Sequence, residues 1–120
     1  MNILIKSCLI TLVIFSFQVQ AINDDTVGGL LKNCEVIDLA NSNDAWSQGY
    51  CFGLFSASME YLAIIEGNNS NSRFALPKEL NVGQLIAVYV KWAKNNPEMW
   101  HMGSHFGVVE SVIEYFPSSD

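Results

Sequence analysis

The stretch that decides the fold is residues 43–67, which read NDAWSQGYCFGLFSASMEYLAIIEG. Its apolar side chains recur every three or four residues, the spacing that gathers side chains on one face of an α-helix. Asn43 suits the helix cap, Asp44 suits the first turn, and Gly67 is the expected stop. The stretch predicts one long helix with a buried stripe made of Trp46, Tyr50, Leu54, Ala57, Tyr61, Ile64 and Ile65.

An adjacent face of the same predicted helix carries small residues. Gly49, Gly53 and Ala57 are each four positions apart. Small residues at this spacing allow another helix to approach closely. In a protein that does not span a membrane, we interpret them as a groove for packing another helix and not as a motif for dimerisation within a membrane.

Upstream, residues 24–33 predict a first, weak helix. Asp24 and Asp25 suit its positive end, whereas Gly28 and Gly29 weaken it by up to about 1 kcal/mol each relative to alanine. Its inward stripe is predicted to be Val27, Leu30, Leu31 and Cys34. We expect this helix to be stable only when it packs against the rest of the domain and is linked to it by a disulfide.

Downstream, the polar residues 67–73 predict an exposed loop. Phe74, Leu76 and Pro77 then return to the core as an extended segment. Asn81 and Gln84 match a capping box at the start of a third helix. The buried stripe of that helix is predicted to be Leu85, Val88, Tyr89 and Trp92.

The third helix is expected to end near residues 95–97, where Pro97 also suits the first turn of the next segment. A break is expected near Gly103, and Pro117 terminates the last helix. The predicted stripe of that helix is Phe106, Val109, Ile113 and Phe116. The expected fold class is all-α, a compact bundle of about four main helices.

The N-terminus has the order of a secretory signal peptide. A single charge at Lys6 precedes the apolar residues 7–17, and a small-x-small ending leads to Ala21. The apolar run is too short for a transmembrane helix, and no second run follows. We expect cleavage between Ala21 and Ile22, which leaves residues 22–120 as one domain with no membrane association.

Charge limits the partners of this domain. Removal of Lys6 leaves 5 basic and 12 acidic residues, a net charge of −7. Nucleic acid and anionic membranes are poor partners, because phosphate binding needs clustered Lys and Arg. A basic protein partner is compatible with this charge, and so is a role in solubility alone.

Two cysteines remain after the signal peptide, which takes Cys8 with it. In an oxidising compartment Cys34 and Cys51 are expected to form a disulfide. No further ligands stand at the spacing of a zinc site. The disulfide is therefore expected to be the covalent cross-link that stabilises the bundle.

The sequence shows no catalytic constellation and no motif for a cofactor: it lacks a nucleophile elbow, a phosphate loop and a zinc-protease helix. His101 and His105 are four apart, with Glu98 and Glu110 nearby. Two histidines fall short of the usual ligand count, so we expect no metal site, although a metal-binding or enzymatic domain is one alternative.

The tryptophans are the other notable residues. Trp46 and Trp92 lie on apolar stripes and are expected in the core. Trp100 lies between Met99 and His101, where either a binding edge or a core position is compatible with the sequence.

Several fragments occur in a recognisable order: Tyr50-Cys51-Phe52-Gly53, Leu76-Pro77, Val82-Gly83-Gln84-Leu85, Asn96-Pro97-Glu98, His101 and Phe116-Pro117. Preceded by Gly29-Leu30, Cys34 and a signal peptide, they resemble the Rap/Tai family of type VI secretion immunity proteins over residues 26–117.

This resemblance implies a small, all-helical, periplasmic protein that is not an enzyme. It implies binding of a peptidoglycan amidase effector, whose active-site groove is occluded, and for some members a homodimer. Two segments could supply the occluding loop, and the sequence does not choose between them. They are Asn68, Asn69, Asn71 and Arg73, and Asn95, Asn96, Glu98 and Trp100.

The chain departs from the pattern at two positions. Many members carry a cysteine just before the Leu-Pro and another after the final Phe-Pro, where this chain has Ala75 and Ser118. The resemblance therefore implies loss of a whole second disulfide.

A small periplasmic chaperone of the acid-stress type is the alternative function. The short spacing from Cys34 to Cys51 argues against it, because that bridge closes only a local loop.

Overall fold

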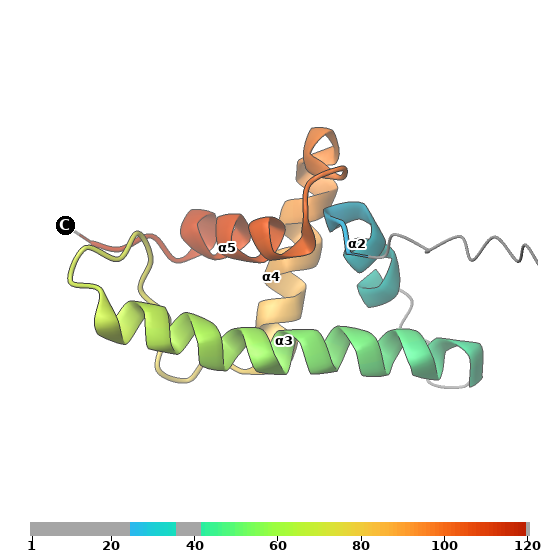
Figure 1. The fold of residues 1–120 in the computed structure, drawn as a ribbon, viewed down its shortest axis with the longest axis horizontal. Helices are drawn as coiled ribbons and strands as arrows, with labels where there is room; N and C mark the ends of the chain where they lie inside the picture. The colour runs from blue at the N-terminus through green and yellow to red at the C-terminus, as the bar shows by residue number, and fades with distance from the viewer. Residues whose placement is uncertain (1–24, 36–41, 120) are drawn as a thin grey trace, which may run out of the picture.

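The computed structural model describes residues 25–35 and 42–119. These form four α-helices, α2 (Val27–Glu35), α3 (Ser42–Asn68), α4 (Val82–Asn95) and α5 (Ser104–Tyr115), with a short 3-10 helix, η1 (Pro97–Met99), before α5 (Figure 1). The prediction of an all-α fold with four main helices is confirmed. The proposed signal peptide and its cleavage site between Ala21 and Ile22 lie outside the described residues.

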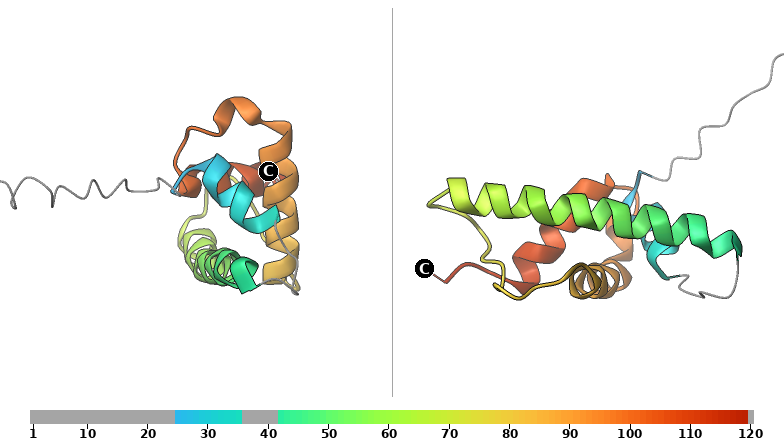
Figure 2. Two further views of the ribbon diagram at one scale, coloured as in Figure 1. Left: turned by 90° about the vertical axis from the view of Figure 1, so that its right-hand side faces the viewer. Right: turned by 90° about the horizontal axis from the view of Figure 1, so that it is seen from below.

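The helices share one core, with α2 and α4 at its centre. In Figure 1, α3 runs along the lower edge, α5 lies above it and α4 crosses behind both, while Figure 2 shows the bundle end-on. α2 packs against all three other helices, and α4 packs against α3 and α5. The apolar residues with no exposed surface are Val27, Leu30, Phe55, Leu85, Tyr89, Ala93 and Val112.

α2 begins at Val27, later than the predicted start at Asp24. The chain before it is extended and forms an antiparallel bridge with the segment that precedes α5. As a result, Asp25 does not lie in the first turn of α2; its carboxylate accepts a 2.6 Å hydrogen bond from the Ser104 hydroxyl. The predicted inward stripe of α2 is confirmed, since Val27, Leu30, Leu31 and Cys34 are all buried.

The predicted face of α3 is wrong in part: Tyr50, Leu54 and Ile65 pack against the core, but the other members of the stripe are exposed. Trp46, Tyr61 and Ile64 were expected in the core but are 62%, 61% and 60% exposed. Its buried side chains are Cys51, Phe55 and Leu62. The physical reason is that apolar residues occupy almost every side of this 27-residue helix, so their spacing does not define one buried face.

The ends of α3 differ by one residue from the prediction. The helix begins at Ser42 and continues to Asn68, so Asn43 and Gly67 both lie within it, while Asp44 is in the first turn as expected. None of the helices in residues 25–35 and 42–119 combines the length and the apolar character needed to cross a membrane.

The predicted packing groove on α3 is not used within the described chain. A Cβ built on Gly49 or Gly53 meets no atom within 4 Å. Both glycines and Ala57 are exposed. These small residues therefore lie on an uncovered side of α3.

α4 matches its prediction closely. The Asn81 side chain accepts a hydrogen bond from the Gln84 amide at 2.9 Å, and the Gln84 side chain accepts one from the Asn81 amide at 3.0 Å. This capping box satisfies amides that the first helical turn leaves unpaired. Leu85, Tyr89 and Trp92 are buried as predicted; Val88 is only half-buried, and the buried set also includes Ile86 and Ala93.

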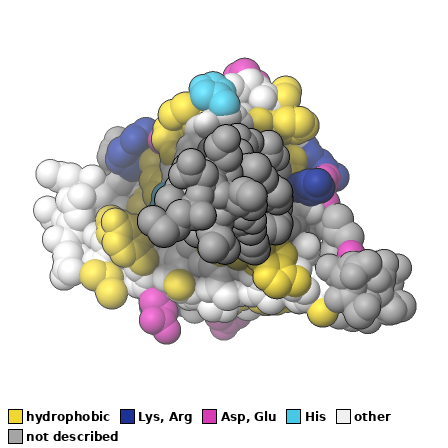
Figure 3. Space-filling view, turned by 45° about the vertical axis from the view of Figure 1, so that its right-hand side comes forward, with side chains coloured by type: hydrophobic (Ala, Val, Ile, Leu, Met, Phe, Trp, Pro, Cys, Tyr) yellow, Lys and Arg dark blue, Asp and Glu magenta, His cyan; other side chains and the backbone are white. Residues whose placement is uncertain are grey.

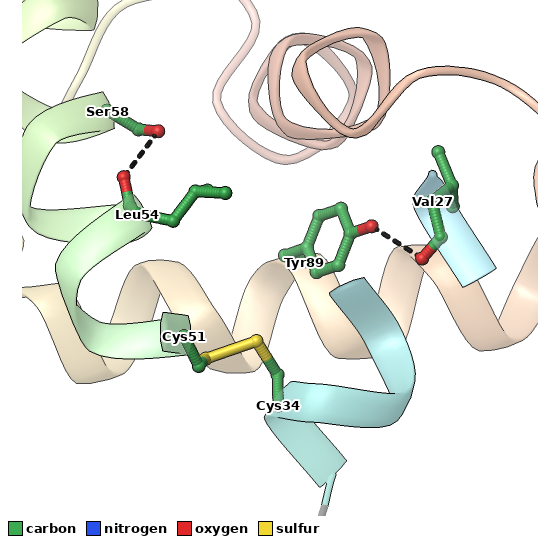
Figure 4. The surroundings of a disulfide bond; sticks show 6 residues. All are labelled: Val27, Cys34, Cys51, Leu54, Ser58 and Tyr89. Carbon is green, nitrogen blue, oxygen red and sulfur yellow. Dashed lines mark hydrogen bonds between the residues drawn. A yellow bond between two sulfur atoms is a disulfide. The ribbon is translucent and has the colours of Figure 1, made fainter. Parts of the chain in front are cut away.

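Tyr89 connects α4 to α2 through the core. Its hydroxyl donates a 2.9 Å hydrogen bond to the carbonyl of Val27, as Figure 4 shows. Burial raises the pKa of Tyr89 above its ordinary value, and the nearby Tyr50 adds to this rise. The hydroxyl therefore keeps its proton and acts as a structural donor.

α5 packs through small residues and not through its predicted large stripe. Phe106, Val109, Ile113 and Phe116 are only half-buried, whereas Ser104, Gly107, Val108, Ser111 and Val112 are buried. Close approach explains the difference. A Cβ on Gly107 would lie 2.6 Å from Val27 Cγ2 and 3.1 Å from Tyr89 Cε2, so only glycine allows α5 to approach α2 and α4 this closely.

The predicted disulfide is confirmed. Cys34 at the end of α2 and Cys51 in α3 are bonded, with their Cα atoms 5.4 Å apart (Figure 4). Both cysteines are 2% exposed. The bridge joins the short α2 to the longest helix from within the core.

Hydrogen bonds hold the C-terminus where the resemblance implied a lost second disulfide. Phe74 and Pro117 form an antiparallel bridge. The Ala75 amide donates to the Phe116 carbonyl at 2.9 Å, and the Ser118 amide donates to the Arg73 carbonyl at 3.2 Å. The predicted return to the core is confirmed for Phe74, which is buried, and Leu76, which is half-buried, but is wrong for Pro77, which is exposed. Backbone pairing ties the segment to the end of the chain.

Replacing both bridge cysteines tests the disulfide. We expect Cys34→Ala together with Cys51→Ala to lower the free energy of unfolding by about 3 kcal/mol, because the unfolded chain regains the entropy of its closed loop. Urea denaturation of the oxidised protein and the double variant measures this difference. A reducing agent should destabilise only the parent protein, and equal sensitivity of both would contradict the prediction.

A pair of glycine substitutions tests the close packing of α5. Gly107→Ala should destabilise by about 1–2 kcal/mol, because the clash with Val27 outweighs the gain in helix propensity. Gly53→Ala, which adds the same methyl group to an open helical position, should stabilise by about 0.5–1 kcal/mol. Thermal and urea unfolding of both variants give the signs, and a stable Gly107→Ala variant would rule out the tight contact.

Candidate functional site

The two predicted binding segments lie in different parts of the molecule. Residues 68–73 follow the C-terminal end of α3. Residues 95–102, here called the tip, join α4 to α5 and project beyond the rest of the bundle (Figures 1 and 2). The structure therefore does not combine the two segments into one site.

The tip is held from within by side-chain hydrogen bonds. The Trp100 indole nitrogen donates to the Ala93 carbonyl at 2.8 Å, and the Asn96 side-chain amide donates to the Trp92 carbonyl at 2.8 Å. Both bonds pair carbonyls of the last turn of α4, and the Ala93 carbonyl also accepts the Asn96 amide at 3.3 Å. The fold of the tip is thus determined before any partner binds.

α2 holds the tip from one side. The Gly28 amide donates to the Trp100 carbonyl at 3.0 Å, and the Val27 amide donates to the Met102 carbonyl at 2.8 Å. A Cβ on Gly28 would lie 3.1 Å from the Trp100 Cβ, so the absence of a side chain at Gly28 allows this contact.

The outer surface of the tip remains accessible. Asn95, Pro97, Glu98 and His101 are exposed, and Trp100 is 44% exposed. Figure 3 shows a histidine with hydrophobic side chains close by at the upper edge of the face turned forward. Both positions that the sequence allowed for Trp100 are therefore partly realised. Its indole nitrogen donates a hydrogen bond to α4, and part of the side chain is exposed to solvent. Asn96 is half-buried, and its amide supports the tip.

The segment 68–73 is more open. Asn68, Asn69, Asn71 and Arg73 are all exposed. Asn69 accepts a 3.0 Å hydrogen bond from the Asn71 amide, a local turn contact. Arg73 lies 4.0 Å from Glu110, and its side chain is 71% exposed, so this ion pair contributes at most about 1 kcal/mol.

The two histidines do not form a metal centre with other ligands. His101 and His105 are both exposed. Within residues 25–35 and 42–119, no group of three or more His, Cys, Asp or Glu residues is placed to hold a metal ion. The metal-binding alternative therefore has no supporting geometry in this part of the chain.

Sequence reasoning missed a groove between α3 and α5. Both helices pack on α2 and α4, and a space of about 700 Å³ is left between them. Its walls include Leu54, Ala57 and Tyr61 from α3 and His105, Val109 and Glu110 from α5. The sequence does contain the apolar stripes of the two helices that line this groove, but both stripes were predicted to be buried in the core.

Comparison with known protein families finds a match over most of the chain. A family model described as Rap1a immunity proteins matches residues 26–118. The chain belongs to the Rap1a immunity protein family. The match spans all four helices, the tip and the paired C-terminal segment of this Rap1a family protein. No curated protein and no solved structure matches the chain.

Family membership confirms the resemblance found in the sequence and indicates an immunity function. Immunity proteins are generally not enzymes and act by binding a cognate effector. In this Rap1a family protein, the tip is accessible to solvent and held by internal hydrogen bonds.

Trp100→Phe tests how the tip is held. The phenyl ring keeps the packing on Gly28 but removes the indole donor, which leaves the Ala93 carbonyl without this partner. We expect a loss of about 1 kcal/mol in the free energy of unfolding, the usual net value of one such bond. Urea denaturation measures it, and faster amide exchange confined to residues 95–102 should accompany it.

Proposed function

We propose that this Rap1a family protein is a periplasmic immunity protein that inhibits a peptidoglycan amidase effector of a type VI secretion system. Its tip would enter the active-site groove of the effector and exclude the substrate. One observation carries this proposal: the tip projects from the bundle while hydrogen bonds from α2 and α4 hold its backbone.

A preformed tip suits an inhibitor for a thermodynamic reason. Ordering a flexible loop on binding costs about 0.5–1.5 kcal/mol for each immobilised side chain. The tip avoids much of this cost, because Trp100 and Asn96 are already bonded to α4. The exposed Glu98 and His101 are then free to contact the effector.

The segment 68–73 is the second surface that could occlude a groove. Its asparagines and Arg73 are exposed, and it is tied to the C-terminus by backbone pairing. It lacks a large apolar side chain among its exposed residues, and interfaces are centred on such anchors. We therefore rank it after the tip.

Two features support export to the periplasm. The Cys34–Cys51 bridge is a bond that persists in oxidising compartments. The proposed signal peptide, residues 1–21, supplies the route, with Ala21 and Ile22 flanking the cleavage site. The net charge of −7 on residues 22–120 favours encounter with a basic effector.

A second copy of the chain is a further partner that we propose on the basis of the resemblance. Sedimentation velocity on the exported protein tests it across a range of concentrations. A mass that stays at the monomer value would remove the homodimer from the proposal without affecting the inhibition.

The chaperone alternative has less support. The bridge spans a sequence separation of 17 residues and links α2 to α3 only, so it closes a local loop. Protection of unrelated client proteins at acid pH, without any dedicated partner, would favour the chaperone.

Calorimetric titration tests the inhibitor. The full chain is expressed with its N-terminal segment, purified after export and titrated with the product of the neighbouring gene. We expect a dissociation constant in the nanomolar range, as in other tight inhibitor complexes, and loss of peptidoglycan cleavage. Glu98→Arg in the tip should weaken binding by about 10-fold or more, since interface centres are sensitive to such changes.

Matched variants separate the two surfaces. Glu114→Arg makes the same charge change at an exposed position of α5 and should leave binding unchanged. If Asn69→Arg weakens binding and Glu98→Arg does not, residues 68–73 are the occluding segment. No binding by correctly oxidised protein would overturn the proposed pairing.

A further inference from the structure

We propose that the groove between α3 and α5, together with the adjoining exposed side of α3, binds a cationic amphipathic segment of a protein partner. The groove accepts the apolar side chains of that segment. The exposed rings of Tyr61 and Trp46 and the carboxylate of Glu110 receive its flanking Lys or Arg residues. This surface shares no residue with the tip, so it can be tested separately from the proposed inhibition.

The groove has the size and lining of a binding site. Its volume of about 700 Å³ lies within the usual range of ligand pockets. Leu54 and Val109 supply apolar surface from opposite helices, and Ala57 leaves room between them. Apolar side chains presented at helical spacing are the usual occupants of a groove between helices.

The apolar surface continues outward from the groove along α3. Tyr61, at the groove wall, is 61% exposed, and Ile64 is 60% exposed one turn further on. Towards the other end of α3, Trp46 is 62% exposed and stacks on Tyr50, with ring centroids 5.4 Å apart. Large apolar side chains gathered on one uncovered helix indicate an interaction surface.

Charge identifies the chemistry of the occupant. The ionised side chains of α3 are Asp44, Glu60 and Glu66, those of α5 are Glu110 and Glu114, and neither helix contains Lys or Arg. Glu110 lines the groove. Its ion-pair partner, Arg73, is 4.0 Å away and mostly exposed, so a closer cation can replace it.

Exposed aromatic rings and carboxylates bind Lys and Arg in two ways. The ring face attracts the cation, and the carboxylate accepts its hydrogen bonds. The rings of Tyr61, at the groove wall, and of Trp46, towards the other end of α3, are both exposed. These rings and the carboxylate of Glu110 in the groove wall are therefore accessible to the basic side chains of a bound segment.

The same charges favour a basic partner over a second copy of this chain. A second copy would present another α3 that carries acidic side chains and no basic ones. Like charges brought together across an interface are unfavourable, whereas a basic segment is attracted.

Two synthetic peptides test the proposal on the exported full-length product. Each has about 14 residues with leucines at helical spacing, and the remaining positions are lysine in one and glutamate in the other. Titration by calorimetry should show binding of the leucine–lysine peptide. The leucine–glutamate peptide should bind at least about 10-fold more weakly, and added salt should weaken the lysine peptide as it screens the charges.

Matched substitutions locate the binding. Ala57→Trp fills the groove from an exposed helical position and should weaken the lysine peptide by about 10-fold or more. Ala63→Trp adds the same side chain to α3 at an exposed position outside the groove and should have no effect. Glu110→Gln should lower both the affinity and its salt dependence, while Glu114→Gln, outside the groove wall, should change both much less.

Three results would overturn the proposal. One is equal binding of the two peptides, and another is equal behaviour of Ala57→Trp and Ala63→Trp. The third is a parent protein that sediments as a dimer and becomes monomeric on Ala57→Trp, which would show a second copy in the groove. Amidase inhibition by the same variants is measured in parallel, so a failed groove proposal leaves the proposed function standing.

Discussion

The rest of the structure depends on the docking of α2 onto α4 and α5. A nine-residue helix with two glycines does not persist alone in water, because isolated helices shorter than about 12–15 residues are marginal. Val27 is its anchor. Its side chain is fully buried, and its backbone carbonyl accepts a hydrogen bond from the Tyr89 hydroxyl. Because Gly107 has no side chain, α5 can pack against Val27 without a clash. Residues from α4 and α5 surround Val27 in the core. These tertiary contacts stabilise α2 as a helix.

From this position α2 organises two distant regions. One end hydrogen-bonds the tip through the Gly28 amide, and the other end is bonded to α3 through Cys34. The same short helix thereby sets both the orientation of the tip and the location of the longest helix. A change that loosens α2 is expected to affect binding and stability together, although α2 itself contacts no partner in either proposal. Substitutions on exposed parts of the tip or of the groove can instead separate the two properties.

The molecule presents two surfaces of different character. The tip projects, is held by hydrogen bonds and carries the partly exposed Trp100, which suits occlusion of a concave site. The groove between α3 and α5 is recessed and largely apolar, with Glu110 in its wall, which suits an amphipathic basic segment. Membership of the Rap1a immunity family indicates an effector as partner, but it does not assign either surface to it. The two surfaces differ physically. The tip presents a backbone that is already ordered, whereas the groove offers apolar surface that a partner could remove from water.

The sequence by itself determined the elements that rest on local chemistry. These are the four helices, the capping box of Asn81 and Gln84, the pairing of Cys34 with Cys51 and the two polar segments exposed at the surface. Only the tertiary structure decided which sides of α3 and α5 are buried. α3 is apolar almost all round, so its spacing was compatible with several faces, and Trp46 was wrongly assigned to the core. α5 packs through Gly107 and its small neighbours, because close contact with α2 excludes larger side chains. The groove follows from the buried sides of α3 and α5, and the hydrogen bonds that hold the tip follow from the docking of α2 beside it. Both need contacts between residues far apart in the chain.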